Sequence, residues 1–258
     1  MPRALLILVT ALFAQHAAAD AIKNTFPVAS IAPDTVGILY PGFSVAAGVN
    51  GAALPKAGRG TAFQLGYSPA IQGWQSHGAF GSVAHAKGSF GIGAGYQGSL
   101  AQDGTLTNGA FAGMGYNVDN FSFGFFLHED NFAFGISPEI NAGLTVELPI
   151  VDFGIVFHGL NQSPSAILAL GTRSGSRMNV ELNVETPSFY NLGGRYIITL
   201  SAQLDAGILG FYFRTSYYTD WNGLYHTVGL GGWAWDAVNL SAQYNTNGQG
   251  TMAATFVF

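Results

Sequence analysis

The last eight residues of the chain, Thr251-Met-Ala-Ala-Thr-Phe-Val-Phe258, decide its predicted fold. Met252, Ala254, Phe256 and Phe258 occupy every second position, and smaller or more polar residues lie between them. This period of two predicts a β-strand with one strongly apolar face. The strand runs to the final residue, which is aromatic.

This ending resembles the C-terminal strand of bacterial outer-membrane β-barrels. In that family the last strand pairs with the first, and the barrel-insertion machinery reads the terminal aromatic residue. The resemblance implies that Phe256 and Phe258 form the C-terminal insertion signal. It also implies outer-membrane lipid and the insertion machinery as partners. A soluble sheet ending in phenylalanine is the alternative.

The composition favours the barrel. Of the 258 residues, 9% are charged, against about 25% in typical soluble domains. Hydrophobic residues make up 48%, yet after residue 20 no run approaches the roughly 18 apolar residues of a membrane helix. A wall with lipid outside and side chains or water inside needs few charges. The sequence therefore favours strands as the elements that cross the membrane.

Charge and cysteine usage exclude several functions. The net charge is −5 and Lys and Arg together number nine, so the chain lacks the basic patch of a nucleic-acid-binding protein. There is no cysteine, which excludes disulfides, cysteine-ligated metals and thiol nucleophiles. We predict no nucleic-acid partner and no cofactor.

The N-terminus has the pattern of a secretory signal peptide. A short positive start at Met1–Arg3 precedes an apolar stretch, Ala4–Ala14, and the small residues Ala17–Ala19 follow. Residues 1–19 are therefore predicted to be a signal peptide cleaved before Asp20, and a short N-terminal helix is the alternative. The predicted location is the bacterial outer membrane.

Residues 20–59 lack sustained alternation and contain four prolines, which argue against a central strand or helix. We predict an irregular plug or hatch-like segment in the barrel mouth or lumen. Three glycines on one face of the predicted strand 89–100 also suit a crowded interior that backbone or a hatch approaches closely. They are Gly91, Gly93 and Gly95.

A short stretch beside this segment resembles a transport family. Asn50-Gly-Ala-Ala-Leu-Pro55, followed by Phe63-Gln-Leu-Gly-Tyr67, is similar to the Asn-Pro-Ala-Ala-Leu segment of the long-chain fatty-acid transport porin (FadL-like) family. Gly51 stands where that family usually has proline. The resemblance implies a hatch inside a 14-stranded barrel and passive transport of small hydrophobic molecules.

From about residue 60 the chain alternates and turns at regular intervals, in segments of roughly the length that a tilted spanning strand needs. An even count suits a bacterial barrel with both termini on the periplasmic side. We predict an all-β fold, a closed antiparallel transmembrane β-barrel of about 14 strands over residues 60–258, with 12 strands as the alternative. The predicted strands are 61–69, 75–85, 89–100, 105–117, 120–128, 139–148, 151–158, 165–172, 177–186, 195–204, 207–217, 224–234, 237–245 and 250–258.

The polar positions of these strands indicate a confined lumen. Met178, Val180 and Leu182, for example, alternate with Asn179 and Glu181. A soluble β-sandwich would alternate in the same way, but its solvated face would carry more charge. Here the polar face is built mainly from Asn, Gln, Ser, Thr and Gly.

The few strand charges gather on three consecutive predicted strands. If the alternation holds, they point into the lumen, where buried charges need partners of opposite sign. We predict a lumen charge cluster that acts either as a structural brace or as a gate that contacts the substrate. Its members are Arg177, Glu181, Glu185, Arg195 and Arg214.

Aromatic residues gather near the ends of the later strands. They predict the aromatic girdle that barrels place at the membrane interfaces, and ordinary sheet aromatics are the alternative. The girdle residues are Tyr217, Tyr218, Trp221, Tyr225, Trp233 and Trp235.

The sequence contains no convincing catalytic or metal-binding motif. The Gly93–Gly98 match to G-x-G-x-x-G precedes no helical pattern, and neither H-E-x-x-H nor G-x-S-x-G occurs. We therefore predict no catalytic residues, no metal site and no enzyme. A structural, non-conducting barrel and, less favoured, a barrel enzyme acting on lipid remain as alternatives to passive transport.

Overall fold

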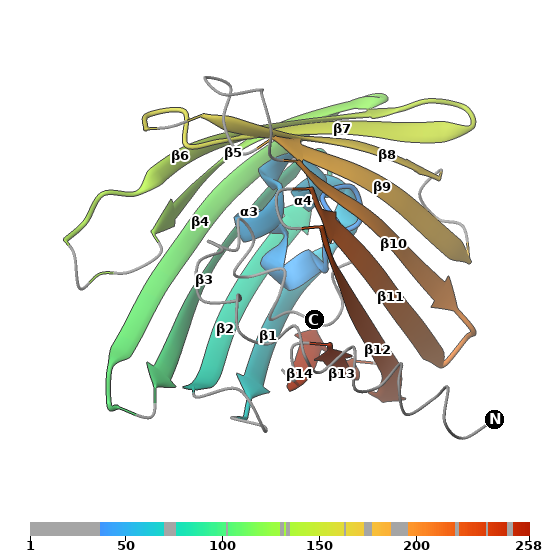
Figure 1. Cartoon of the computed structure of the whole chain (residues 1–258). Helices are drawn as coiled ribbons and strands as arrows, with labels where there is room; N and C mark the ends of the chain where they lie inside the picture. Colours follow the sequence, from blue (N-terminus) through green and yellow to red (C-terminus); the bar gives the residue numbers. More distant parts are fainter. Residues whose placement is uncertain are drawn as a thin grey trace.

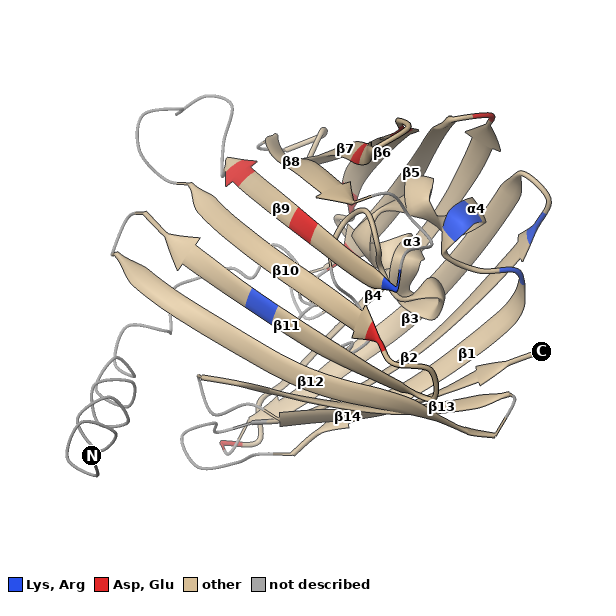
Figure 2. Ribbon diagram, turned by 90° about the vertical axis from the view of Figure 1, so that its right-hand side faces the viewer, with Lys and Arg blue, Asp and Glu red and all other residues tan. Residues whose placement is uncertain are grey.

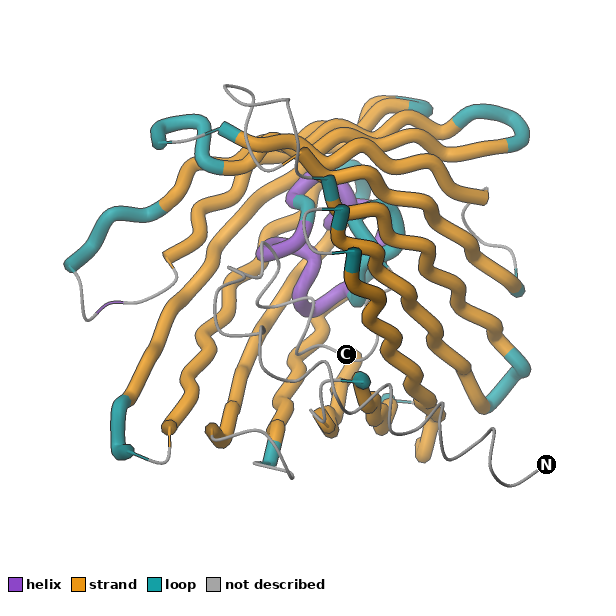
Figure 3. The backbone as a smooth tube through the Cα atoms, in the orientation of Figure 1, coloured by secondary structure: helices purple, strands orange, loops and turns teal. Residues whose placement is uncertain are grey.

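The fold is a closed antiparallel β-barrel of 14 strands with short helices in its lumen (Figures 1 and 3). The computed structural model describes residues 37–69, 76–101, 103–129, 132, 135–162, 164–172, 177–186, 196–219, 222–235, 237–246 and 250–258. The predicted signal peptide, its cleavage site and residues 20–36 lie outside the described residues, as do Arg195 and Trp221.

Each strand pairs with its neighbour in sequence, and β1 pairs with β14 to close the barrel. Phe63 lies opposite Phe256 across this seam, with ring centroids 6.4 Å apart. All 14 predicted strands are present, so the predicted count is confirmed. The strands are β1 (Gly60–Ser68), β2 (Ser76–Lys87), β3 (Phe90–Ala101), β4 (Leu106–Val118), β5 (Phe121–Glu129), β6 (Glu139–Glu147), β7 (Val151–His158), β8 (Ser165–Thr172), β9 (Met178–Thr186), β10 (Ile197–Asp205), β11 (Leu209–Tyr218), β12 (Gly223–Trp235), β13 (Val238–Asn245) and β14 (Gly250–Val257).

The alternation in the sequence separates the two faces of the wall. On β5, Phe121, Phe123 and Phe125 are exposed on the outer face, while Ser122 and Phe126 are buried inside. Large apolar side chains are exposed in the same way on every strand from β1 to β14. An exposed apolar surface of this extent is what a wall in contact with lipid presents.

The two ends of the barrel differ in the length of their connections. At the end where β1 begins and β14 finishes, successive strands are joined by two to five residues, at 88–89, 119–120, 148–150, 173–177, 206–208 and 236–237. At the opposite end the connections have four to ten residues, at 69–75, 102–105, 130–138, 159–164, 187–196, 219–222 and 246–249. We call the first the short-turn end and the second the long-loop end.

Residues 37–59, here called the plug, lie inside the barrel (Figures 1 and 3). The segment was predicted to be irregular, but it contains four one-turn helices. Asn50 caps one of them by accepting a hydrogen bond from Ala52 N at 3.1 Å. Pro55 occupies the first turn of another, where a missing N–H is tolerated. The helices are η2 (Phe43–Val45), α3 (Ala46–Val49), η3 (Gly51–Ala53) and α4 (Leu54–Ala57).

Among the described residues, no helix has the length and apolar character needed to cross a membrane.

Candidate functional site: the barrel lumen and its plug

A platform of inward-facing glycines brings the plug against the wall. A β-carbon on Gly91 would lie 2.8 Å from Leu54 Cβ, and one on Gly93 would lie 2.9 Å from Ala47 Cβ. Further along, on β5, a β-carbon on Gly124 would lie 2.3 Å from the carbonyl carbon of Gly51. Real β-carbons essentially never lie this close to other atoms, so the expectation that backbone or a hatch comes close is confirmed at Gly91, which Leu54 approaches, and at Gly93, which Ala47 approaches. A β-carbon on Gly95 would instead overlap the Phe111 ring.

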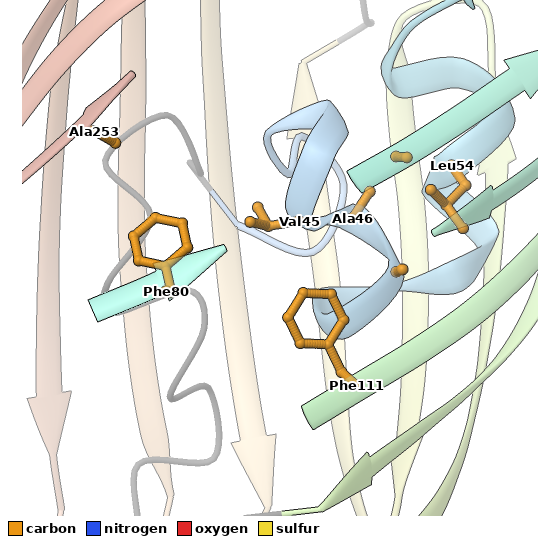
Figure 4. Close-up of a cluster of buried hydrophobic side chains, with 8 residues drawn as sticks. Val45, Ala46, Leu54, Phe80, Phe111 and Ala253 are labelled. Atoms are coloured by element: carbon orange, nitrogen blue, oxygen red, sulfur yellow. The ribbon is translucent and has the colours of Figure 1, made fainter. Parts of the chain in front are cut away.

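Apolar side chains seal the plug to this platform. Val45, Ala46 and Leu54 from the plug pack against Phe80 of β2 and Phe111 of β4 (Figure 4). A second cluster joins Ile38 and Val49 to Phe126, Val156, Ile167 and Ala169. Each fully buried Val, Leu, Ile or Phe side chain in these clusters is worth about 1.5–3 kcal/mol. The β2–β8 half of the lumen is therefore filled by the plug.

Glu181 of β9 holds the start of the plug. Its Oε1 accepts a hydrogen bond from Ile38 N at 2.8 Å, and its Oε2 accepts one from Leu39 N at 3.2 Å. The side chain is 0% exposed. A buried carboxylate is tolerated only when it is paired or hydrogen-bonded, and backbone amides meet that need here.

Other polar contacts fix the rest of the plug. Lys56 Nζ lies 2.9 Å from Glu147 Oε1 on β6. Tyr40 donates to Asp152 Oδ2 on β7 at 3.1 Å. Burial and the neighbouring Asp152 carboxylate raise the pKa of the Tyr40 hydroxyl, which therefore stays protonated and able to donate. Carboxylates of three wall strands thus hold the plug.

Two residues of the plug are also held through hydrogen-bonded amides. Ser44 donates to Gln64 Oε1 at 3.1 Å, and Gln64 in turn donates to Thr255 at 2.8 Å, beside the barrel seam. Asn50 Nδ2 donates to Ile38 O at 2.9 Å and so ties the start of the plug to its middle.

The sequence predicted that the charged residues of the lumen cluster all point inward and need partners of opposite sign. In the structure, the partners of Glu181 include the backbone of the plug. Glu181 and Arg214 lie in one row, both directly opposite Ser201, but Glu181 hydrogen-bonds the plug. Glu185 is buried four positions further along β9. Arg177 is exposed just before β9. Figure 2 shows how sparse these charges are on β9 and β11.

The predicted aromatic girdle is wrong for Tyr218, Tyr225 and Trp233. The register places Tyr218 and Tyr225 on the inner face, with ring centroids 5.3 Å apart. Trp233 lies opposite Asn239 and lines the lumen. Tyr217 and Trp235 do face outward, because they pair with the outward residues Leu224 and Val238. They lie at opposite ends of the barrel.

This difference between two tryptophans gives a testable prediction. Trp235 is 71% exposed on the outer face, whereas Trp233 faces the lumen. In barrels reconstituted with brominated lipids, we expect a protein whose sole tryptophan is Trp235 to show strong fluorescence quenching. A protein whose sole tryptophan is Trp233 should be quenched much less. Equal quenching would contradict the assigned faces.

A cavity of about 510 Å³ lies at the short-turn end of the lumen, between the plug and the wall. Tyr40 and Phe43 line its plug side, and Asn179, Gln203 and Asn239 are among its wall residues. Ligand pockets typically have volumes of about 300–1,000 Å³. The cavity is large enough to admit a small molecule.

The inner face of β9–β14 differs from the half that packs the plug. Its inward residues are mainly amides, hydroxyls and glycines. The hydroxyls of Ser201, Ser241 and Thr251 are buried and have no hydrogen-bonding partner among the described residues. Buried polar groups require partners, so water or a solute is expected to contact this face.

Groups of three or more His, Asp or Glu side chains that could bind a metal are absent from the described residues.

Comparisons with known proteins find similarity among solved structures alone. No protein-family model matches, and no curated protein matches by sequence. Among solved structures, a triple mutant of the Rhodopseudomonas blastica porin is similar at 9% identity and a TM-score of 0.46, over 77% of this chain and 98% of that chain. Another mutant of the same porin has 7% identity and a TM-score of 0.48, over 77% of this chain and 99% of the other.

Proposed function

We propose that this protein is a bacterial outer-membrane barrel for the passive transport of small molecules. The observation that carries the proposal is the divided lumen: the plug fills the β2–β8 half, a polar wall lies on the other side, and a cavity of about 510 Å³ lies between the plug and the wall at the short-turn end. A polar interior behind an apolar outer surface is the arrangement of water-filled barrel channels. Short turns face the periplasm in such barrels, which would place the cavity at the periplasmic mouth.

The residues that line the cavity indicate whether the solute is polar or hydrophobic. The resemblance to fatty-acid transport porins predicts hydrophobic substrates, and this remains a prediction. The amide, hydroxyl and indole groups of the wall favour a solute that forms hydrogen bonds. We therefore propose small polar solutes ahead of hydrophobic ones.

A structural, non-conducting barrel is the second candidate, because the two apolar clusters seal half of the lumen. Planar-bilayer recordings and liposome-swelling assays with the purified protein separate the two functions. We expect discrete conductance steps and solute uptake. Insertion of a folded, heat-modifiable barrel that gives neither conductance nor uptake would overturn the transport proposal. Recovery of the protein outside the outer-membrane fraction would overturn its location.

A further inference from the structure

The wall of the cavity at the short-turn end carries two rows of hydrogen-bonding side chains. Within each row, the side chains lie in register on three neighbouring strands and line the cavity. Gly210 and Gly231, which lie opposite each other on β11 and β12, add no side-chain bulk between the rows. The rows are Asn179, Gln203 and Tyr212 on β9–β11, and Trp233, Asn239 and Thr255 on β12–β14.

These groups suit hydroxyl-bearing ligands. Amide and hydroxyl side chains each donate and accept hydrogen bonds, as ligand hydroxyls do. The flat rings of Trp233 and Tyr212 on the wall, and of Phe43 on the plug, offer apolar surfaces for the faces of a ring. A ring with hydroxyls at its edge could use both kinds of surface together.

The charged side chains of the cavity offset one another. Two cations, Lys56 and Arg59, and two anions, Glu147 and Asp152, line it. Lys56 pairs with Glu147, and Asp152 accepts a hydrogen bond from Tyr40. The lining therefore carries no net charge, and the cavity as a whole attracts neither anions nor cations over its surroundings.

We propose that this cavity is a binding site for a small uncharged ring with two or more hydroxyl groups, either a monosaccharide or a dihydroxybenzene. The proposal rests on the proposed transport function, because the site would select solutes at the mouth of the same lumen. Binding is nevertheless measurable without transport, so the two proposals can fail separately.

Isothermal titration calorimetry of the full-length folded barrel in detergent tests the site. Glucose and catechol are the two probes, and glucuronate, 3,4-dihydroxybenzoate and toluene are their charged or hydroxyl-free counterparts. We expect saturable binding of glucose or catechol and none of the counterparts. Saturation by glucose assigns the site to carbohydrates, and saturation by catechol assigns it to hydroxylated aromatics.

Variants locate the binding to this cavity. Asn239→Leu and Gln203→Leu each remove one amide from the wall, which should weaken binding roughly two- to tenfold, as expected for one hydrogen bond. Thr227→Val removes a hydroxyl from the inner face of β12 outside the cavity, and its binding should match the unmodified protein. No saturable binding of either probe, equal binding of toluene, or unchanged affinity in both amide variants would overturn the proposal. Conductance measured on the same preparations tests the channel independently.

Discussion

The Gly124→Ala variant should displace the plug and open the lumen. A β-carbon at this position would overlap Gly51 C and Ala52 N of the plug backbone, and it would also lie 2.6 Å from Met114 O on β4, so that this part of the wall must shift slightly as well. Backbone cannot rotate away as a flexible side chain can, so residues 50–52 must leave the platform. Overpacking of this kind costs about 1–3 kcal/mol, and sometimes more. We expect a larger single-channel conductance in planar bilayers than that of the unmodified protein.

A matched glycine elsewhere on the inner face provides the control. Gly78 lies on β2, and a β-carbon there would meet only Ser68 Cβ at 3.5 Å and Gly98 O at 3.9 Å, which are ordinary contacts. Gly78→Ala should therefore conduct as the unmodified protein does. If Gly124→Ala and Gly78→Ala show the same conductance, the plug does not restrict the lumen.

Replacing Glu181 by leucine should release the plug by a second route. The variant keeps a side chain of similar size but leaves Ile38 N and Leu39 N without the oxygens that accept their hydrogen bonds. Each stranded buried donor costs about 1–3 kcal/mol. Because about 1.4 kcal/mol corresponds to a tenfold change in an equilibrium, the population with the plug displaced should rise roughly tenfold or more.

A single introduced thiol measures this release, because the chain has no cysteine. Ala47 in α3 is 0% exposed, so Ala47→Cys should react slowly with a membrane-impermeant maleimide in the otherwise unmodified protein. Adding Glu181→Leu should speed the labelling. Glu181→Gln keeps one acceptor oxygen and should give an intermediate rate. Equal rates in all three proteins would show that Glu181 does not hold the plug.

Much of the barrel could be predicted from the sequence. The wall separates an apolar outside from a polar lumen, so apolar and polar residues alternate along its strands. The Phe121–Phe125 stretch and the Met178–Val184 stretch show their outward faces by alternation alone. The glycines Gly91 and Gly93 likewise indicated a close approach, because only glycine leaves room for another backbone against a strand. The approaching segment proved to be the plug.

The predicted aromatic girdle was wrong for three residues, and the sequence contained one sign of this. Tyr217 and Tyr218 are adjacent, so a strand must place them on opposite faces, and they could not both belong to an outer girdle. Trp233 and Trp235 have the same parity, but the register shifts between them, and they point to different sides of the wall. An irregularity of this kind depends on pairing with the next strand, which the alternation of one strand does not reveal.

The sequence by itself determined the order of the strands and the separation of an apolar outside from a polar inside, because these follow from local alternation and short connections. It predicted about 14 strands but left 12 open, and the closed barrel decided for 14. Only the tertiary structure decided the partners of the lumen charges. Glu181 meets backbone amides about 140 positions earlier in the chain, and such amides carry no signature in the sequence. The division of the lumen into a plugged half and a half with a polar wall likewise exists only once the barrel has closed around residues 37–59.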